Sequence, residues 1–274
     1  MRNMAILCTT DGSERSLRAL PHAARVASVT GEELTLLRVL EPKGPPAAQC
    51  EQELNAHLAA SGSGGRVLIG SRGGGESVAD VICRVAGEIG ARLIAFDTRG
   101  SGALRRAVIG SVAVEVLEES PAPLLMTGPN ATAPTDGGSN YRVAFAADGA
   151  PEHHGRLAKL VDVMDLPGIE PILIGVSVPV INEPENPLEE LTSELRRLAA
   201  SMEHSRPIEV IASRAKGFEK VEAGIVRLAT EAGAEAIGMV SAHTSRTRHI
   251  FMGSVSLATL NRSHVPIILA RADA

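Results

Sequence analysis

The sequence is poor in aromatic residues, with no Trp, one Tyr and four Phe among its 274 residues. Proteins that bind single-stranded nucleic acid stack the bases on aromatic side chains, and this chain offers few of them. Its net charge is −5, so it also lacks the overall positive field that attracts a nucleic-acid backbone. We therefore expect no nucleic-acid partner.

Long apolar runs are absent as well. The stretch PILIGVSVPVI at residues 171–181 is among the longest, yet it is too short to span a bilayer and it contains Pro. The N-terminal MRNMAILCTT lacks the apolar segment that is typical of a signal peptide. The sequence therefore predicts no membrane association.

Cysteines are few, and the three of them, Cys8, Cys50 and Cys83, do not have the spacing of a metal site. An odd number of thiols without such spacing favours free cysteines in a reducing compartment. We expect a cytoplasmic protein in which Cys8, inside a predicted strand, packs as a small apolar side chain.

What the chain does have is an internal repeat. Residues 97–111 (DTRGSGALRRAVIGS) correspond to residues 240–254 (VSAHTSRTRHIFMGS), 143 positions later. Each segment follows an apolar run, ends in Gly-Ser and precedes a second apolar run that stands behind a proline. The segments that open the two copies also match, with Asp11 and Asp148 lying 137 positions apart.

The repeat predicts two domains, residues 1–129 and residues 141–274. Each of them is long enough to bury its own core. Between them, residues 130–140 are rich in Gly, Asn and Thr and show no periodicity, which is typical of a linker.

Each copy alternates short β-rich runs with longer amphipathic runs, which is typical of an α/β fold. Within residues 76–90, Val78, Ile82, Val85 and Ile89 recur every three or four positions and predict a helix with one buried face. The β-rich runs are apolar throughout, as expected for parallel strands that are covered on both faces of an open sheet. The expected strands are 5–10, 33–40, 66–71, 91–96 and 123–128 in the first copy and 141–147, 170–178, 208–213, 234–239 and 266–270 in the second.

Ligands of an open parallel sheet bind beyond the carboxyl ends of the strands, and the residues that follow the first and fourth strands lie there. Gly100 allows the backbone to approach a ligand closely. Gly110 and Ser111 open a predicted helix, whose first N–H groups and partial positive charge suit a phosphate. Ser111 would bind a phosphate oxygen or cap the helix, and Asp11 would bind a ribose or a base or serve only as a helix cap.

The pattern Gly-x-x-Gly, nine residues and Gly-Ser/Thr, with an Asp that closes the first strand, resembles the universal stress protein family. The resemblance covers nearly the whole chain as two tandem copies, and it implies in each a five-stranded parallel sheet in the order 3-2-1-4-5, flanked by helices. Many members of the family bind ATP or AMP through these loops, whereas others lack the motif and do not. Since Asp11, Gly100, Gly110 and Ser111 match the family positions, the resemblance implies ATP or AMP, alone or with Mg²⁺, in the first domain.

The first loop departs from the family pattern at Asp97, which stands in the position of the family's first glycine. A carboxylate close to a triphosphate is repulsive. We expect Arg99, together with Arg105 and Arg106 or a bridging Mg²⁺, to offset that repulsion. AMP, which carries fewer phosphates, would be repelled less than ATP.

The second copy keeps Asp148, Gly253 and Ser254 but has Val240 and His243 in place of the two loop glycines. A β-branched side chain fits poorly where a ligand must approach the backbone. The main site is therefore expected in the first domain, with the second domain as a structural partner or a sensor for another anion.

Enzyme signatures are missing, because the chain has no P-loop, no dinucleotide fingerprint after the first strand and no nucleophile elbow. His153 and His154 are adjacent and lack a third ligand at useful spacing, so no metal site is expected. The expected function is a regulatory or protective stress-response protein that binds an adenine nucleotide and hydrolyses ATP at most slowly and incidentally. Two alternatives stay open, a nucleotide-free interaction scaffold in which both sites have decayed and a slow ATPase or nucleotidyl-transfer enzyme.

The fifth strands, PLLMT and PIILA, are apolar and should lie at the edge of each sheet. An exposed apolar edge invites pairing. We expect the two domains to pair within the chain as a pseudo-dimer, and the whole chain to be capable of forming a homodimer.

Overall fold

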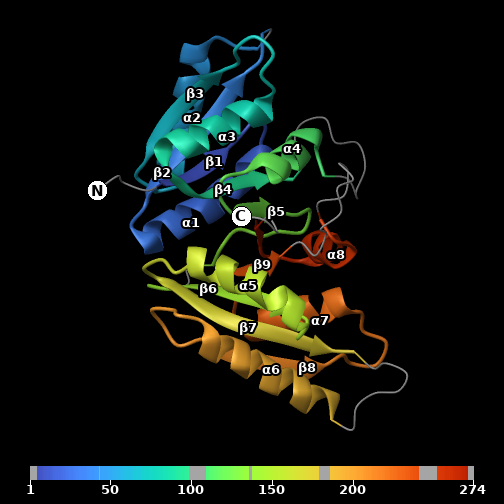
Figure 1. Cartoon of the computed structure of the whole chain (residues 1–274). Coiled ribbons are helices and arrows are strands. Elements are labelled where there is room, and N and C mark those ends of the chain that lie inside the picture. Colours follow the sequence, from blue (N-terminus) through green and yellow to red (C-terminus); the bar gives the residue numbers. More distant parts are fainter. Residues whose placement is uncertain are drawn as a thin grey trace. The chain divides into compact units, whose positions relative to one another are not determined.

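The computed structural model describes residues 5–42, 44–98, 109–135, 138–178, 186–240 and 252–270. The chain divides into two compact units, unit 1 (Met1–Thr127, with Ala274) and unit 2 (Gly128–Asp273). Each unit is an α/β domain built on parallel strands with helices between them (Figure 1). The fold expected from the alternating runs is therefore confirmed.

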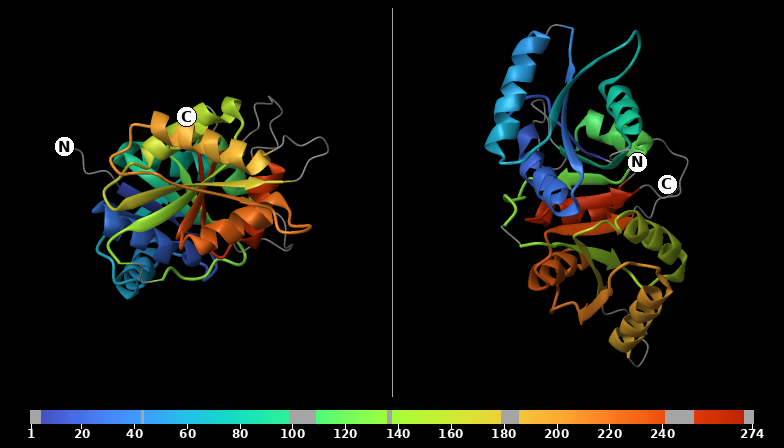
Figure 2. Two further views of the ribbon diagram at one scale, coloured as in Figure 1. Left: turned by 90° about the horizontal axis from the view of Figure 1, so that it is seen from below. Right: turned by 90° about the vertical axis from the view of Figure 1, so that its left-hand side faces the viewer.

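In unit 1 the strands lie in the order β3-β2-β1-β4-β5, and each neighbouring pair is parallel. The strands are β1 (Ala5–Thr9), β2 (Glu33–Leu40), β3 (Arg66–Ser71), β4 (Ala91–Asp97) and β5 (Leu124–Thr127). The helices are a short 3₁₀ helix (Ser16–Ala19), α1 (Leu20–Thr30), α2 (Ala47–Ala60), α3 (Val78–Ile89) and α4 (Ser111–Glu119). One face of the sheet carries α1 and α2, and the other carries α3 and α4 (Figure 2).

Unit 2 repeats this topology with the order β8-β7-β6-β9-β10. Its strands are β6 (Tyr141–Ala147), β7 (Ile169–Ser177), β8 (Glu209–Arg214), β9 (Ala236–Val240) and β10 (Ile267–Ala270). Its helices are α5 (Pro151–Val163), α6 (Pro187–Ser201), α7 (Val221–Glu231) and α8 (Ser254–Arg262). All ten strands expected from the sequence are present, with bounds that shift by at most two residues.

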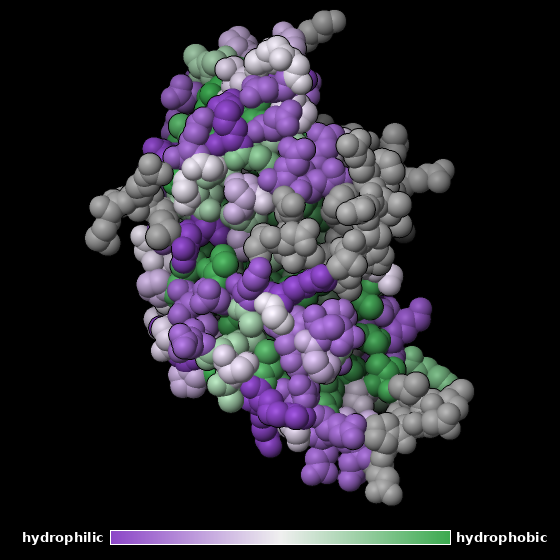
Figure 3. Space-filling model, viewed as in Figure 1, coloured by the Kyte–Doolittle hydropathy of each residue, from purple (hydrophilic) through white to green (hydrophobic). Residues whose placement is uncertain are grey.

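The core of each unit consists of its central strands and the inner faces of its helices. Every residue of β1 is buried, including Cys8, whose thiol pKa burial raises from 9.0 to about 12. Ile82 and Val85 of α3 are buried as the spacing predicts. Among the described residues on the face shown in Figure 3, hydrophilic side chains predominate over hydrophobic ones.

The turn between β3 and α3 shows how the sequence sets a helix start. Ser77 and Asp80 form a capping box, in which each side chain accepts a hydrogen bond from the backbone N–H of the other. Gly75 before it has a φ of +88°, a left-handed conformation that glycine adopts without a steric penalty. The run of three glycines that ends at Gly75 is therefore a strand-to-helix turn.

The segment expected as a linker forms hydrogen bonds with unit 2. Thr132 donates its N–H to the carbonyl of His264 over 2.9 Å, and the Asn130 side chain donates to the carbonyl of Asn261 over 2.8 Å. None of the helices in the described part of the chain combines the length and apolar character needed to cross a membrane. The three cysteines are free thiols, as expected.

Candidate functional site

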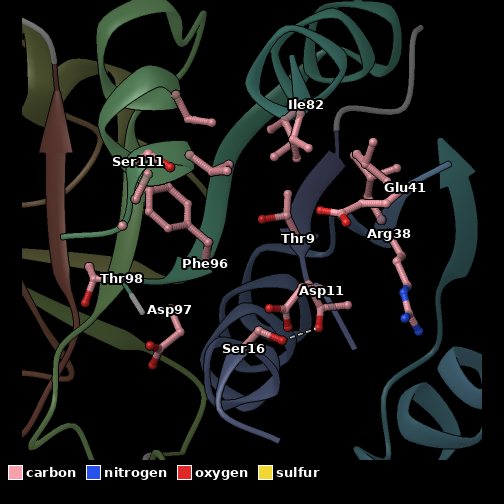
Figure 4. A pocket seen from close by; sticks show the side chains of 18 of the residues that line it. Thr9, Asp11, Ser16, Arg38, Glu41, Ile82, Phe96, Asp97, Thr98 and Ser111 are labelled. Atoms are coloured by element: carbon pink, nitrogen blue, oxygen red, sulfur yellow. Dashed lines mark hydrogen bonds between the residues drawn. The ribbon is translucent and has the colours of Figure 1, made fainter. Parts of the chain in front are cut away.

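A cavity of about 810 Å³ opens in unit 1 at the carboxyl ends of β1, β2 and β4 (Figure 4). Its size falls within the range of roughly 300–1,000 Å³ that is usual for small-molecule sites. The cavity lies at the carboxyl edge of the sheet, where β1 has β2 on one side and β4 on the other and the order of the strands reverses. Open α/β sheets bind their ligands at such a point. The residues chosen from the sequence that lie in its wall are Asp11, Asp97, Gly110 and Ser111.

The chain beyond β1 is held by a small network of polar groups. Asp11 Oδ1 accepts a hydrogen bond from the N–H of Ser13 over 2.9 Å, and the hydroxyls of Thr10 and Ser16 lie 2.6 Å apart in another hydrogen bond. The N-cap of α1 is Ala19, so Asp11 does not cap that helix. The carboxylate instead orders the turn after the strand and presents an exposed side chain at the cavity.

Arg38 of β2 brings a positive charge close to this turn. Its guanidinium packs so tightly against Gly12 that an added Cβ there would lie 2.5 Å from Nη1. Gly12 has a φ of +88°, so any other residue at that position would be strained. Arg38 Nη1 also lies 3.4 Å from Oε2 of Glu53, so its charge is shared with a carboxylate of α2.

The N-terminus of α4 forms another part of the wall. Gly110 is its N-cap and donates its N–H to the carbonyl of Thr98 over 2.9 Å, which fixes the helix start beside β4. Ser111 is exposed and makes no capping hydrogen bond, so its hydroxyl is not used to cap the helix. The first N–H groups of a helix have no partner within it, and those that follow Gly110 are suited to an anion.

Glycine at position 110 is not required by the described fold. Its φ of −64° and ψ of 152° are open to any residue, and the nearest described atom to an added Cβ is the carbonyl oxygen of Thr98 at 3.6 Å. The absence of a side chain there leaves room in the cavity, which is the property that a backbone-bound ligand needs.

The side chain of Asp97 points away from the place where the sequence analysis expected it, close to the phosphates of a nucleotide. Its side chain is 2% exposed, and its Oδ2 accepts a hydrogen bond from the Thr127 hydroxyl over 2.8 Å and lies 3.9 Å from Nη1 of Arg18. Because side chains alternate along a strand, Asp97 points to the opposite side from Phe96, as Figure 4 shows. The carboxylate thus belongs to a buried polar group between β4, β5 and the 3₁₀ helix, and its negative charge has a nearby cation within the fold.

Several wall residues were not anticipated from the sequence. Phe96 and Ile82 give the cavity an apolar side, and the hydroxyl of Thr9 and the carboxylate of Glu41 point into it (Figure 4). Arg38 was open to prediction, because a charged residue within the apolar strand ELTLLRVL needs a partner. Glu41 carries no such signal, since it stands in a loop where acidic residues are common.

Two backbone features of the unit 1 site recur in unit 2, namely the turn after the first strand and the start of the last helix. Asp148 Oδ1 accepts the N–H of Ala150 over 3.0 Å, in the same type of turn as at Asp11, and its Oδ2 lies 2.7 Å from Nδ1 of His153. The N-cap of α5 is Ala150, so Asp148 is no cap either. Gly253, with φ −61° and ψ 158°, starts α8 as Gly110 starts α4, and Ser254 is exposed without a capping hydrogen bond.

The side chains around this backbone differ. The register of β6 with β7 pairs Ala147 with Gly175. The register of β1 with β2, extended by one residue, would pair Thr10 with Arg38. Gly175 therefore stands where unit 1 has its arginine. Leu191 of α6 packs there instead. A Cβ added at Gly149 would lie 2.8 Å from Cδ1 of Leu191, and a Cβ added at Gly175 would lie 3.1 Å from Cδ2 of Leu191.

The remaining site residues chosen from the sequence lie outside the described residues. They are Arg99, Gly100, Arg105 and Arg106 of the first copy and His243 of the second. In the part of the chain that the structure describes, no group of three His, Cys, Asp or Glu side chains could hold a metal ion. His153 pairs with Asp148, and His154 Nδ1 lies 3.5 Å from Glu194 Oε1.

Comparison with known proteins gives the same division of the chain. The model of the universal stress protein family matches residues 3–128 and, a second time, residues 141–271. No curated protein matches the chain at a significant level.

Two solved structures that cover nearly the whole chain share the fold. A universal stress protein from Archaeoglobus fulgidus DSM 4304 is 21% identical, with 99% of each chain covered and a TM-score of 0.63. A protein of unknown function from Pseudomonas aeruginosa PAO1 is 19% identical, with 98% of this chain and 92% of that chain covered and a TM-score of 0.64. A universal stress protein from Archaeoglobus fulgidus, solved in complex with dAMP, is 24% identical and covers 46% of this chain and 98% of its own, with a TM-score of 0.38.

The two matched segments take up most of the sequence, and one falls in each unit. The chain belongs to the universal stress protein family, as a tandem of two family domains.

Proposed function

We propose that unit 1 binds an adenine nucleotide, ATP or AMP, in its cavity and acts as a regulatory or protective stress-response protein. The observation that carries the proposal is the start of α4, where Gly110 leaves open space beside a helix N-terminus in the wall of an 810 Å³ cavity. A phosphate bound there would meet backbone N–H groups and the positive end of the helix dipole.

The charges of the described wall indicate how phosphates would be held. Asp11, Glu41 and Asp97 are acidic and Arg38 is the basic residue of that wall, with Glu53 beside it. The backbone N–H groups of α4 and the hydroxyl of Ser111 must therefore supply much of the attraction. Arg99 or a Mg²⁺ ion would add positive charge for ATP, whereas AMP needs less.

The proposed role is binding without catalysis. Within the described wall, the hydroxyls of Thr10 and Ser16 bond to each other, with no histidine in the wall to activate either of them. Asp97 is engaged by Thr127. Slow, incidental ATP hydrolysis is compatible with such a site, and a turnover assay with and without Mg²⁺ would measure it.

For unit 2 we propose a structural role without a nucleotide. Leu191 packs on the two glycines at the equivalent position, and Val240 takes the place of Asp97. The cytoplasmic location, the pairing of the two domains and the homodimer stay predictions, as does the absence of a nucleic-acid partner.

The decisive experiment measures the nucleotide content and affinity of the full chain. Native mass spectrometry of freshly purified protein, followed by chromatography of the denatured extract, should find one adenine nucleotide per chain. In calorimetric titrations with AMP and Mg-ATP, Gly110→Val should abolish binding because its side chain would occupy the space beside the helix start.

Gly253→Val is the matched control, because Gly253 has nearly the same backbone angles at the start of α8. It should leave the affinity unchanged. Unchanged affinity in Gly110→Val would refute the assigned site, and two nucleotides per chain would refute the role given to unit 2. No nucleotide, and no binding on addition of either one, would favour the interaction scaffold.

A further inference from the structure

The buried carboxylate of Asp97 belongs to a group of polar side chains that connects β4, β5 and the segment after β1. Its Oδ2 accepts the hydroxyl of Thr127 over 2.8 Å and lies 3.9 Å from Nη1 of Arg18 in the 3₁₀ helix. The same helix carries Ser16, whose hydroxyl is hydrogen-bonded to that of Thr10 over 2.6 Å. We call these five side chains the polar cluster.

Unit 2 has the same strand order but none of the residues of the polar cluster. The residues that correspond to Thr10, Ser16, Arg18, Asp97 and Thr127 are Ala147, His153, Gly155, Val240 and Ala270, which stand 137 positions later for the first three and 143 positions later for the last two. Val240 and Ala270 are register partners, as Asp97 and Thr127 are. The fold therefore forms without the polar cluster, and we look for the role of the cluster in the site of unit 1.

On one side the polar cluster holds the start of α4. Thr98, the residue after Asp97, donates its N–H to the carbonyl of Thr127 over 3.2 Å and accepts the N–H of Gly110 over 2.9 Å. The side chain of Asp97 is bonded to the same Thr127. In Figure 4 this side chain points away from Ser111, so the carboxylate faces away from the proposed phosphate position.

On the other side the polar cluster holds the turn after β1. The Thr10 hydroxyl accepts the N–H of Gly12 over 3.0 Å, beside Asp11. Its partner Ser16 lies in the 3₁₀ helix that also carries Arg18, and this helix packs on β4 and β5. Asp97 thus lies between the two parts of the backbone that would hold the nucleotide.

We propose that Asp97 is a positioning residue of the nucleotide site. Through Thr127 and Arg18 it holds the start of α4 and the turn after β1 in the arrangement that the nucleotide needs, without touching the ligand. This inference rests on the nucleotide site proposed for unit 1. It also reverses the effect that the sequence suggests for Asp97, namely repulsion of the phosphates.

The direction of a change in affinity distinguishes these two roles. Asp97→Gly removes the charge and introduces the glycine of the family pattern, so a repulsive carboxylate predicts tighter binding of AMP and Mg-ATP. A positioning residue predicts weaker binding, by about two- to thirtyfold, which is the usual range for residues that act on a ligand without contact. Asp97→Asn keeps an oxygen acceptor for Thr127 and should lose less affinity than Asp97→Gly does.

The titrations use the full chain at a temperature at which circular dichroism shows each variant to be folded. The double variant with the residues of unit 2, Asp97→Val with Thr127→Ala, should also bind AMP more weakly than the wild type. Thr30→Val is the matched control, because Thr30 is buried, donates its hydroxyl to the carbonyl of Val26 and lies outside the described cavity wall. It should leave the affinity unchanged.

Hydrogen exchange without ligand tests the positioning separately from nucleotide binding. In Asp97→Gly the amides of residues 109–113 should exchange about tenfold faster than in the wild type, because the segment that holds them has lost a buried hydrogen bond. Thr30→Val should not change this exchange.

The outcomes distinguish the inference from the function on which it rests. Unchanged or tighter binding of AMP by Asp97→Gly, or unchanged exchange of residues 109–113, would overturn the role of Asp97 and leave the nucleotide site in place. A wild-type protein that binds neither AMP nor Mg-ATP would overturn both proposals.

Discussion

The hydroxyl of Thr127 donates a hydrogen bond to the carboxylate of Asp97 over 2.8 Å, and both side chains are buried between neighbouring strands. The two residues are register partners on β5 and β4. At the equivalent register position of unit 2, Ala270 pairs with Val240. One copy of the repeat therefore holds a polar pair where the other holds an apolar pair.

This difference predicts a coupled effect on stability. Thr127→Val keeps the shape of the side chain but leaves a buried carboxylate without its donor, which should lower the free energy of unfolding by about 1–3 kcal/mol. Replacing both residues by their unit 2 counterparts, Asp97→Val with Thr127→Ala, should cost less than the sum of the two single changes. Urea denaturation followed by circular dichroism measures Thr127→Val and the four proteins of the cycle, namely the wild type, Asp97→Val, Thr127→Ala and the double variant. Strict additivity in the cycle would show that the pair is not coupled.

The buried thiol of Cys8 predicts a pH dependence. Burial raises its pKa from 9.0 to about 12. A group with a raised pKa in the folded state contributes stability that is complete below pH 9 and is lost as the pH rises toward 12. Wild-type protein should therefore lose stability more steeply between pH 9 and 11 than Cys8→Ala does, and parallel curves would contradict the assigned burial.

The same thiol should be unreactive in the folded protein. Cys83 is partly exposed, whereas Cys8 and Cys50 are buried. With a thiol reagent at pH 8, Cys83 should react first, and Cys8 should react only as fast as the protein unfolds. Mass spectrometry of the labelled peptides checks the order, and early labelling of Cys8 would count against it.

Leu191 should make Gly149 more sensitive to substitution than a comparable glycine. Gly149 and Gly138 have φ values of +76° and +74°, so alanine is strained at both, by about 1–2 kcal/mol. Only at Gly149 would the added Cβ also meet a described side chain, Leu191 Cδ1 at 2.8 Å. Gly149→Ala should therefore lower the melting temperature more than Gly138→Ala, and Leu191→Ala in the same chain should reduce that difference.

Three serines at helix starts provide a test of capping. Ser77 accepts a hydrogen bond from the N–H of Asp80, whereas Ser111 and Ser254 make no capping bond. Ser77→Ala should lower the free energy of unfolding by about 1 kcal/mol, and the other two alanine variants should change it little. A loss in Ser111→Ala as large as in Ser77→Ala would mean that its hydroxyl has a structural use.

The sequence was sufficient for the strands, because a short run that is apolar throughout, such as that of β1, is typical of a parallel strand covered on both faces. It also placed Asp11 and Gly110 at the same edge of the sheet, since the fold brings the carboxyl ends of β1 and β4 together; their role in binding stays a prediction. The direction of Asp97 was not obtained, because the repeat assigns a position in the chain and gives no information on the facing strand. Thr127, which holds the carboxylate, is thirty positions away.

Two further features depend on contacts between distant segments. The close approach of Arg38 to Gly12 and the packing of Leu191 on Gly149 and Gly175 each join elements that no spacing rule relates. Apart from Arg38, the residues that make these contacts are single glycines and one leucine. Such residues occur in many structural roles, so the sequence alone does not single them out. The register of β6 with β7 places Gly175 at the position of Arg38, 137 residues later, which is the same offset that relates Asp11 to Asp148.

Leu191 stands in unit 2 where unit 1 has the guanidinium of Arg38, and we expect the two halves of the chain to respond differently to a nucleotide. A ligand that binds only the folded state adds stability that grows with its concentration, by about 2.7 kcal/mol at a hundred times its dissociation constant. Nucleotide bound to the open cavity of unit 1 would raise the resistance of that half to unfolding and proteolysis. Unit 2, for which we propose no nucleotide, would not respond, so its stability would serve as an internal reference for the nucleotide-dependent stability of unit 1.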